Sequence, residues 1–332
     1  MASARRNRLH LVIGLVISAA AIYLSLRQID FKTLRTALSS ADYFYILPAM
    51  IGQVGCFFLK GTAWRYLLMP AKKTISSLST TAVLIIGLMV NDLFPAKMGE
   101  LARAYGMGEK ENLSKTLCLS TILVEHLLDI SILLLFLLVL LPLVSLPPWL
   151  RTTGVLIGFT SLGIIGGLFL AMRREEKFER SLGGLVRYLP GKIQGRAQSV
   201  IHNVLQGLRA VTGRYILYSF TLLAGMWLLV SLVAYLVMAA FGLFLPIQAP
   251  VMVTVFTAFG KIIPSAPGAI GTYHYLGILV LGSFGVGKET ALAYAIVLHA
   301  LSFLMEVSLG IILLLAGNLS LDRLTRQGKE TA

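Results

Sequence analysis

One short stretch, residues 91 to 103, places charged side chains directly after an apolar segment. It carries Asp92 and Arg103 around a proline and a glycine. A charged side chain at the centre of a membrane helix costs about 2.5–3.5 kcal/mol on insertion scales, so it usually faces a protein interior or a wet cavity. Proline removes a backbone donor and glycine loosens the chain. We therefore expect a broken, non-spanning element with its tip between Pro95 and Gly99.

Composition places this stretch in a membrane protein. Hydrophobic residues make up 57% of the chain and charged residues 13%, whereas a soluble domain has about 25% charged residues. The 29 Lys and Arg residues outnumber the 15 Asp and Glu residues and give a formal net charge of +14. Because the basic residues cluster in loops beside apolar runs, we attribute this excess to membrane topology and expect no nucleic-acid partner. The predicted fold class is an all-α polytopic membrane protein.

Six apolar runs are predicted to span the membrane. The first follows three arginines and is not followed by a small-residue cleavage site, so we interpret it as a retained helix with a cytoplasmic N-terminus. Lys60 and the basic residues after it should return the chain to the cytoplasm, and basic residues also follow the last run. We expect a multi-pass protein of the inner (plasma) membrane with both termini cytoplasmic. The predicted spans are residues 9–26, 43–59, 117–141, 152–172, 215–241 and 290–316.

Two further apolar segments are predicted to be re-entrant. Residues 81–107 must enter and leave from the cytoplasm, and residues 250–285 must do so from outside. Two full crossings would satisfy the same parity, but the arms are only about 13 to 17 residues long, against about 20 for a span. Broken backbone at this depth is tolerated only where protein or water surrounds it. The predicted breaks are Pro95, Gly99, Pro264, Pro267, Gly268 and Gly271.

We interpret residues 1–332 as a single integral membrane domain made of two halves. Residues 9–172 and 215–318 each contain one broken segment, and the two enter from opposite faces, an arrangement typical of an inverted repeat. Corresponding short, Gly- or Pro-interrupted segments point to a midplane binding site in a transporter. The linker, residues 173–214, has apolar residues at helical spacing and predicts an amphipathic helix on the inner leaflet, as a connector or a docking site.

Polar side chains near the two breaks predict a hydrophilic path. Glu125 and Asp129 are four residues apart and share a helix face, where two carboxylates repel unless a cation or proton intervenes. Arg103 and Lys97 are the expected partners. Helix N-termini at the breaks suit a phosphate or another anion, so a headgroup could pass here while its tails stay in lipid. The predicted path residues are Asn91, Lys97, Glu100, Arg103, Glu125, His126, Asp129, Lys261, His299 and Glu306.

Each of these residues also has a structural interpretation. Glu100 could pair with Arg103 only to join two helices, and His126 and His299 could be neutral core histidines. The chain has no His-Glu-x-x-His motif, no Gly-rich phosphate loop and no compact ligand group, so we predict no metal, no cofactor and no catalytic residue. The alternatives are an intramembrane lipid-modifying enzyme using the polar residues of 117–141, and an accessory membrane subunit.

The motifs around these residues resemble those of a known family. They are Asn91…Phe94-Pro95-x-x-x-Gly99-Glu100-x-x-Arg103, then Glu125-x-x-x-Asp129, then Pro264-x-x-Pro267-Gly268-x-x-Gly271. Together they resemble the lysylphosphatidylglycerol synthase transmembrane-region family, the flippase-like domain of aminoacyl-phosphatidylglycerol synthase/flippase proteins, over about residues 10 to 318. The resemblance implies a polytopic inner-membrane protein that moves lipids between leaflets, with the matching polar residues near the path.

Two departures from the family pattern shape the functional expectation. His126 stands where the family usually has arginine, which makes this position titratable near neutral pH. The soluble synthetase domain of bifunctional members is absent from the sequence, so aminoacylation is not carried over. We expect a stand-alone flippase or scramblase-like transporter for an anionic phospholipid or polyprenyl-linked amphiphile. The expected partner is a membrane lipid with an anionic headgroup, and a homo-oligomer is a further option.

Overall fold

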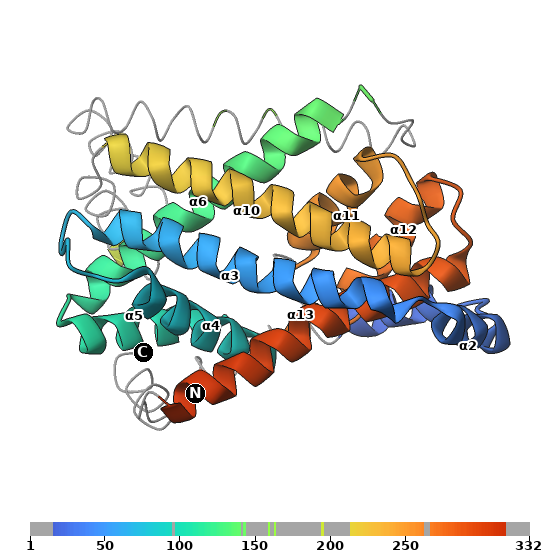
Figure 1. The fold of residues 1–332 in the computed structure, drawn as a ribbon, viewed down its shortest axis with the longest axis horizontal. Coiled ribbons are helices and arrows are strands. Elements are labelled where there is room, and N and C mark those ends of the chain that lie inside the picture. The colour runs from blue at the N-terminus through green and yellow to red at the C-terminus, as the bar shows by residue number, and fades with distance from the viewer. Residues whose placement is uncertain are drawn as a thin grey trace.

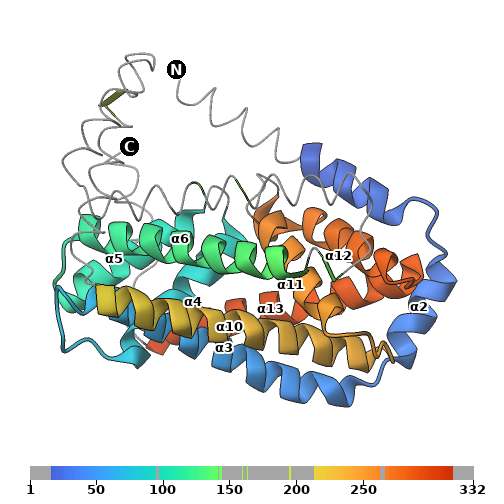
Figure 2. The same ribbon diagram turned by 90° about the horizontal axis from the view of Figure 1, so that it is seen from above.

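The computed structural model describes residues 16–94, 97–140, 142–143, 213–261 and 266–316, together with positions 159, 163, 194 and 195. This part of the chain forms helices and no strands, and most of its helices run along the long axis of the molecule (Figures 1 and 2). Within it, four helices are long and apolar enough to cross a membrane. The polytopic all-α class is therefore confirmed. The four are α3 (Ile46–Leu68), α6 (Lys115–Leu140), α10 (Gly213–Ala240) and α13 (Lys288–Ala316).

These four helices correspond to four of the six predicted spans. The predicted span 152–172 and most of the linker 173–214 lie outside the described residues. Of the span 9–26, the structure describes the part Val16–Leu26, which is an apolar helix. One boundary was wrong, because α3 continues to Leu68 and not to residue 59. Lys60 is therefore inside a helix and does not begin a cytoplasmic loop.

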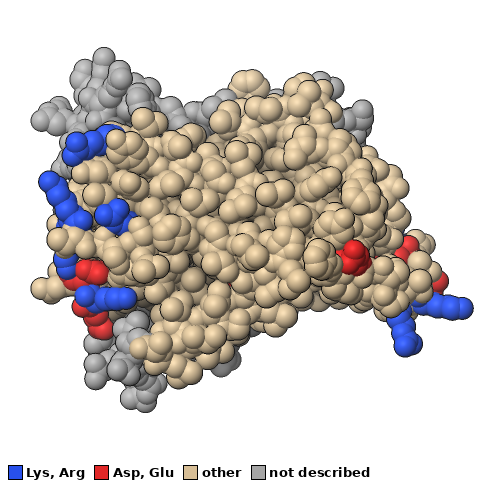
Figure 3. All heavy atoms as spheres, in the orientation of Figure 1, with Lys and Arg blue, Asp and Glu red and all other residues tan. Residues whose placement is uncertain are grey.

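The outer surface has the charge pattern of a membrane protein. Charged side chains gather toward the two ends of the long axis on the face shown in Figure 3, and the band between them is free of charge. Large apolar side chains on the long helices are exposed, including Ile51 at 75% and Leu304 at 63%. An apolar surface of this extent is unfavourable in water and is covered by lipid tails in a bilayer.

Both predicted broken segments form pairs of short helices. The first consists of α4 (Ser77–Leu93) and α5 (Met98–Glu111), with arms of 17 and 14 residues. The second consists of α11 (Gln248–Gly260) and α12 (Thr272–Ser283), with arms of 13 and 12 residues. All four arms are shorter than the roughly 20 residues of a span. The two hairpins lie toward opposite ends of the molecule (Figure 1).

Left-handed backbone marks both turns. Lys97 has a φ of 52° immediately before α5. Gly268 and Gly271 have φ values of 68° and 96° beside the short 3₁₀ helix η2 (Pro267–Ala269), a conformation that glycine adopts without steric cost. The predicted breaks at Gly268 and Gly271 therefore coincide with non-helical backbone. The predicted break at Gly99 was wrong, because Gly99 is the second residue of α5 and the non-helical backbone lies at Lys97, whereas Pro267 begins η2. Pro95 and Pro264 lie outside the described residues.

The tips of the two hairpins contact each other. A β-carbon placed on Gly268 would lie 3.7 Å from the carbonyl oxygen of Asp92 and 3.8 Å from the ring of Phe303 on α13. Asp92 belongs to the last turn of α4, so the second tip packs directly on the end of the first hairpin. This contact brings polar residues from both halves of the chain together.

The open end of the first hairpin is tied to the loop before it. Glu111, the last residue of α5, forms an ion pair with Lys72 at 2.8 Å and accepts a hydrogen bond from Ser79 at 3.0 Å. Burial alone would raise the pKa of Glu111, but these two hydrogen bonds hold that pKa below its ordinary value. The C-terminal end of α5 is therefore held by these contacts, and its N-terminal end lies at the packed tip of the hairpin.

Candidate functional site

Arg103 and Glu125 form the buried centre of the site. Their side chains are 1% and 0% exposed. The Arg103 guanidinium donates to both carboxylate oxygens of Glu125, at 2.7 and 3.3 Å, in the two-pronged geometry that makes such pairs strong. It also lies 4.4 Å from the centre of the Trp64 ring. Arg103 therefore connects α5 to both α6 and α3.

Glu100 connects this pair to the tip of the first hairpin. One of its oxygens lies 3.3 Å from Arg103, and the other accepts a hydrogen bond from Asn91 at 3.1 Å. Nε2 of His126 lies 3.2 Å from that second oxygen. Asn91 also accepts a hydrogen bond from the backbone N–H of Gly99 at 2.8 Å, which closes the turn between α4 and α5. The Glu100–Arg103 pair lies within one helix and does not by itself join two helices.

Lys60 separates the two carboxylates of α6. It forms an ion pair with Asp129 and lies 3.4 Å from Glu125, and Asp129 also accepts a hydrogen bond from Trp227 on α10 at 2.8 Å. We expected Arg103 and Lys97 as the partners of these carboxylates. Arg103 is one of them. The other cation is Lys60, because Lys97 is exposed at the start of α5 and makes no ion pair with a described residue.

The charges of this group do not balance. Among these residues, three carboxylates face two permanent cations, and the half-exposed His126 can supply a third positive charge only when it is protonated. The Nε atom of Arg103 is buried and has no acceptor among the described residues. We call this group the Arg103 cluster. It comprises Lys60, Asn91, Glu100, Arg103, Glu125, His126 and Asp129.

A second polar group surrounds the tip of the other hairpin. Tyr273 and His299 are stacked with ring centres 4.6 Å apart, and His274 meets His299 edge-on at 5.0 Å. The amino group of Lys261 lies 5.8 Å from the centre of the Tyr273 ring. Glu306 is 6% exposed on α13. We call these five residues the Lys261 cluster.

Asp92 and Lys60 join the two clusters electrostatically. Lys261 and Asp92 are the charges that act most strongly on Glu306, and Asp92 is within hydrogen-bonding reach of that carboxyl. The charge of Lys60 repels that of Lys261 and attracts the carboxylate of Glu306. The two groups therefore form one polar region across the meeting tips. It contains every predicted path residue except Lys97.

Several members of this region were not predicted from the sequence. Lys60 was assigned to a loop, although a span of about 20 residues that starts at position 43 would have included it. Trp64 and Trp227 gave no sequence signal, because their role depends on which helices pack together. Among the described residues, no group of three or more His, Cys, Asp or Glu could hold a metal ion.

The sequence of this chain matches a known family. Residues 11–310 match the family described as the lysylphosphatidylglycerol synthase TM region. The chain belongs to this family. It is 23% identical to a UPF0104 membrane protein of Methanothermobacter thermautotrophicus over 91% of this chain and 92% of that protein. A second UPF0104 membrane protein of the same organism is 25% identical over 83% and 84% of the two chains.

A more distant relative is longer than this family member. The glycosyltransferase AglD of Haloferax volcanii is 23% identical over 98% of this chain, which matches 57% of AglD. No solved structure matches the chain. Membership in the lysylphosphatidylglycerol synthase TM region family implies a lipid-related role in a membrane, and the UPF0104 relatives are consistent with a stand-alone member.

Proposed function

We propose that this protein moves a lipid between leaflets by passing its headgroup through the region formed by the Arg103 and Lys261 clusters. The observation that carries the proposal is the meeting of two short hairpins, from opposite ends of the molecule, at a group of buried charges. A headgroup that crosses hydrocarbon without partners loses its hydration at a large cost in free energy. Polar side chains at the centre of the protein replace part of that hydration and lower the barrier.

The arrangement of cations suggests how an anionic headgroup would bind. Arg103 and Lys60 are held by carboxylates, whereas Lys261 is exposed at the end of α11. Lys261 is therefore the cation that we expect to meet a phosphate first. The headgroup would belong to an anionic phospholipid or a polyprenyl-linked amphiphile, and the proposal involves no chemical change in the lipid.

Replacing Glu100 with glutamine tests the proposal most directly. Glu100 is only 16% exposed but lies at the edge of the Arg103 cluster, so Glu100→Gln should fold while its neutral amide loses the ion pairs with Arg103 and His126. We expect translocation of a fluorescent phospholipid in reconstituted vesicles to fall to the protein-free rate, with an unchanged elution profile and melting temperature. Mass spectrometry should show unchanged lipid masses with the wild type. Translocation by Glu100→Gln at the wild-type rate, or chemically altered lipid, would contradict the proposal.

An imposed pH gradient should alter the rate of translocation. The region's carboxylates outnumber its permanent cations, so an anionic headgroup would add to an existing negative charge unless protons enter with it. We expect faster movement of an anionic lipid away from the acidic side than toward it, measured in vesicles with the gradient in each orientation. An ionophore that collapses the gradient should remove the difference. Equal rates in both orientations would exclude coupled proton uptake. The residues that set this balance are Lys60, Asp92, Glu100, Arg103, Glu125, His126, Asp129, Lys261 and Glu306.

A further inference from the structure

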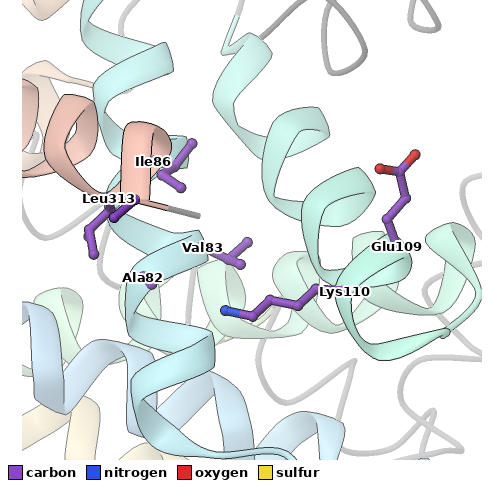
Figure 4. Close-up of a pocket in the computed structure, with 7 residues that line it drawn as sticks. Ala82, Val83, Ile86, Glu109, Lys110 and Leu313 are labelled. Carbon is purple, nitrogen blue, oxygen red and sulfur yellow. The ribbon is translucent and has the colours of Figure 1, made fainter. Parts of the chain in front are cut away.

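A groove lies between α5 and α13 with α4 as its floor, away from the two clusters. Its volume is about 440 Å³, within the roughly 300–1,000 Å³ of small-ligand sites. Figure 4 shows the Lys110 side chain extending over α4 toward Val83, whereas Glu109 points away from the groove. The groove is lined by Ala82, Val83, Ile86, Glu109, Lys110, Leu313 and Ala316.

Lys110 gives this groove a single inward charge. Its side chain is exposed and makes no hydrogen bond or ion pair with a described residue. The neighbouring carboxylates have other ion-pair partners, since Glu109 pairs with Lys115 at 4.0 Å and Glu111 pairs with Lys72, and Lys110 interacts with Glu111 through charge attraction without forming an ion pair. An apolar floor with one unpaired amine at its rim is complementary to an anionic amphiphile.

The surface around the groove indicates that its occupant is a lipid. Ile312 and Leu315, beside the groove on α13, are 58% and 74% exposed. Side chains this apolar belong on a surface that faces lipid tails. The groove also lies at the end of the molecule that holds Lys72 and Glu111, which the sequence predicts to be cytoplasmic. A lipid of that leaflet can reach the groove from the side.

We propose that this groove binds one anionic phospholipid of the predicted cytoplasmic leaflet. Its phosphate binds Lys110, and one acyl chain lies on Ala82, Val83 and Ile86. This inference rests on the proposed lipid translocation, but binding of the phospholipid to the groove can be measured without transport.

The groove leads toward the polar region and is closed before reaching it. On α13, Leu313, Gly310 and Glu306 are three and four residues apart, so they share one face of the helix. A β-carbon on Gly310 would lie 2.6 Å from the β-carbon of Met89 on α4, so the two helices are in close contact there. The apolar packing of α4 against α13, which includes Met89 and Val307, therefore lies between the groove and Glu306. In this proposal, a lipid binds in the groove before it enters the translocation path.

Charge reversal at Lys110 tests the site. Binding of a fluorescent phosphatidylglycerol to the purified protein in detergent should weaken about tenfold or more in Lys110→Glu, as expected from the loss of a charge-assisted hydrogen bond. Lys110→Arg should retain binding. Lys73→Glu is the matched control, because Lys73 is an exposed lysine of the α3–α4 loop that does not line the groove. Equal weakening in Lys110→Glu and Lys73→Glu would reduce the effect to general charge attraction and overturn the proposal.

Filling the groove provides an independent test. Ala82→Phe should block the acyl chain and weaken binding without lowering the melting temperature of the lipid-free protein. A lower lipid-free melting temperature would show that a protein segment already occupies the groove, and unchanged binding would show that the lipid lies elsewhere; either result overturns the proposal.

Wild-type protein that binds the lipid but does not move it would contradict only the proposed function. Normal translocation with unchanged binding in Lys110→Glu would contradict only the groove.

Discussion

Arg103→Ala is expected to lower the free energy of unfolding by about 3–5 kcal/mol, the usual cost of removing one partner from a buried ion pair. Without the guanidinium, Glu125 keeps a buried carboxylate whose remaining cation, Lys60, is shared with Asp129. The stacking on Trp64 is lost as well. Denaturant or thermal unfolding of the purified protein in detergent measures the change. Lipid translocation should be lost in any fraction that stays folded.

Two control variants test whether the loss of stability comes from the ion pair between Arg103 and Glu125. Arg35→Ala removes an exposed arginine from α2 (Phe31–Ser40) and should alter stability by no more than about 0.5 kcal/mol. The double variant Arg103→Ala/Glu125→Gln should lose less stability than the sum of its single variants, because no uncompensated carboxylate remains at position 125. Additive losses, or an Arg103→Ala protein as stable as wild type, would show that the two side chains do not form a coupled pair.

Gly99→Ala is expected to open the first hairpin. The added β-carbon would lie 1.9 Å from the carbonyl oxygen of Gly87 and 2.6 Å from the amide of Asn91. The Gly87 oxygen belongs to the backbone of α4, so the clash cannot be relieved by rotating a side chain. Overpacking of this kind costs about 1–3 kcal/mol or more, and the shift would move Glu100 and Arg103 away from α6. We expect lower stability and loss of translocation in the same variant.

Gly106→Ala is the matched control for this prediction. Gly106 lies on the same helix, but a β-carbon there would be 3.5 Å from Val83, which is an ordinary contact. Since alanine is favoured over glycine by up to about 1 kcal/mol inside a helix, Gly106→Ala should be neutral or slightly stabilising. Similar losses in both variants would indicate a general intolerance of α5 to substitution and would contradict a specific close approach at Gly99.

Much of the architecture could be predicted from local patterns in the sequence. The arms of the two broken segments were predicted to be shorter than a membrane span, and the four helices that form them have 12 to 17 residues. The first hairpin extends over residues 77 to 111 and the second over 248 to 283, close to the predicted 81–107 and 250–285. Segment length and glycine positions are local properties of the sequence, which explains why the predicted bounds of the two hairpins agree with the structure.

The errors involved residues whose role depends on distant parts of the chain. Lys60 resembled a flanking lysine because it stands near the end of an apolar run, yet its partner Asp129 lies 69 residues further along. Lys97 is close to the charged motif in sequence, but the left-handed turn that precedes α5 leaves it exposed. Proximity in sequence was therefore a poor guide to ion pairing.

The sequence by itself determined that this is a helical membrane protein with two interrupted segments and charged residues near their breaks. Only the tertiary structure decided which charges meet, namely Arg103 with Glu125, Lys60 with Asp129, and Asp92 with the second hairpin. The physical reason is that hydropathy and helix breaks are local properties of the chain. The partner of a buried charge is set by how α3, α4, α5, α6 and α13 pack together.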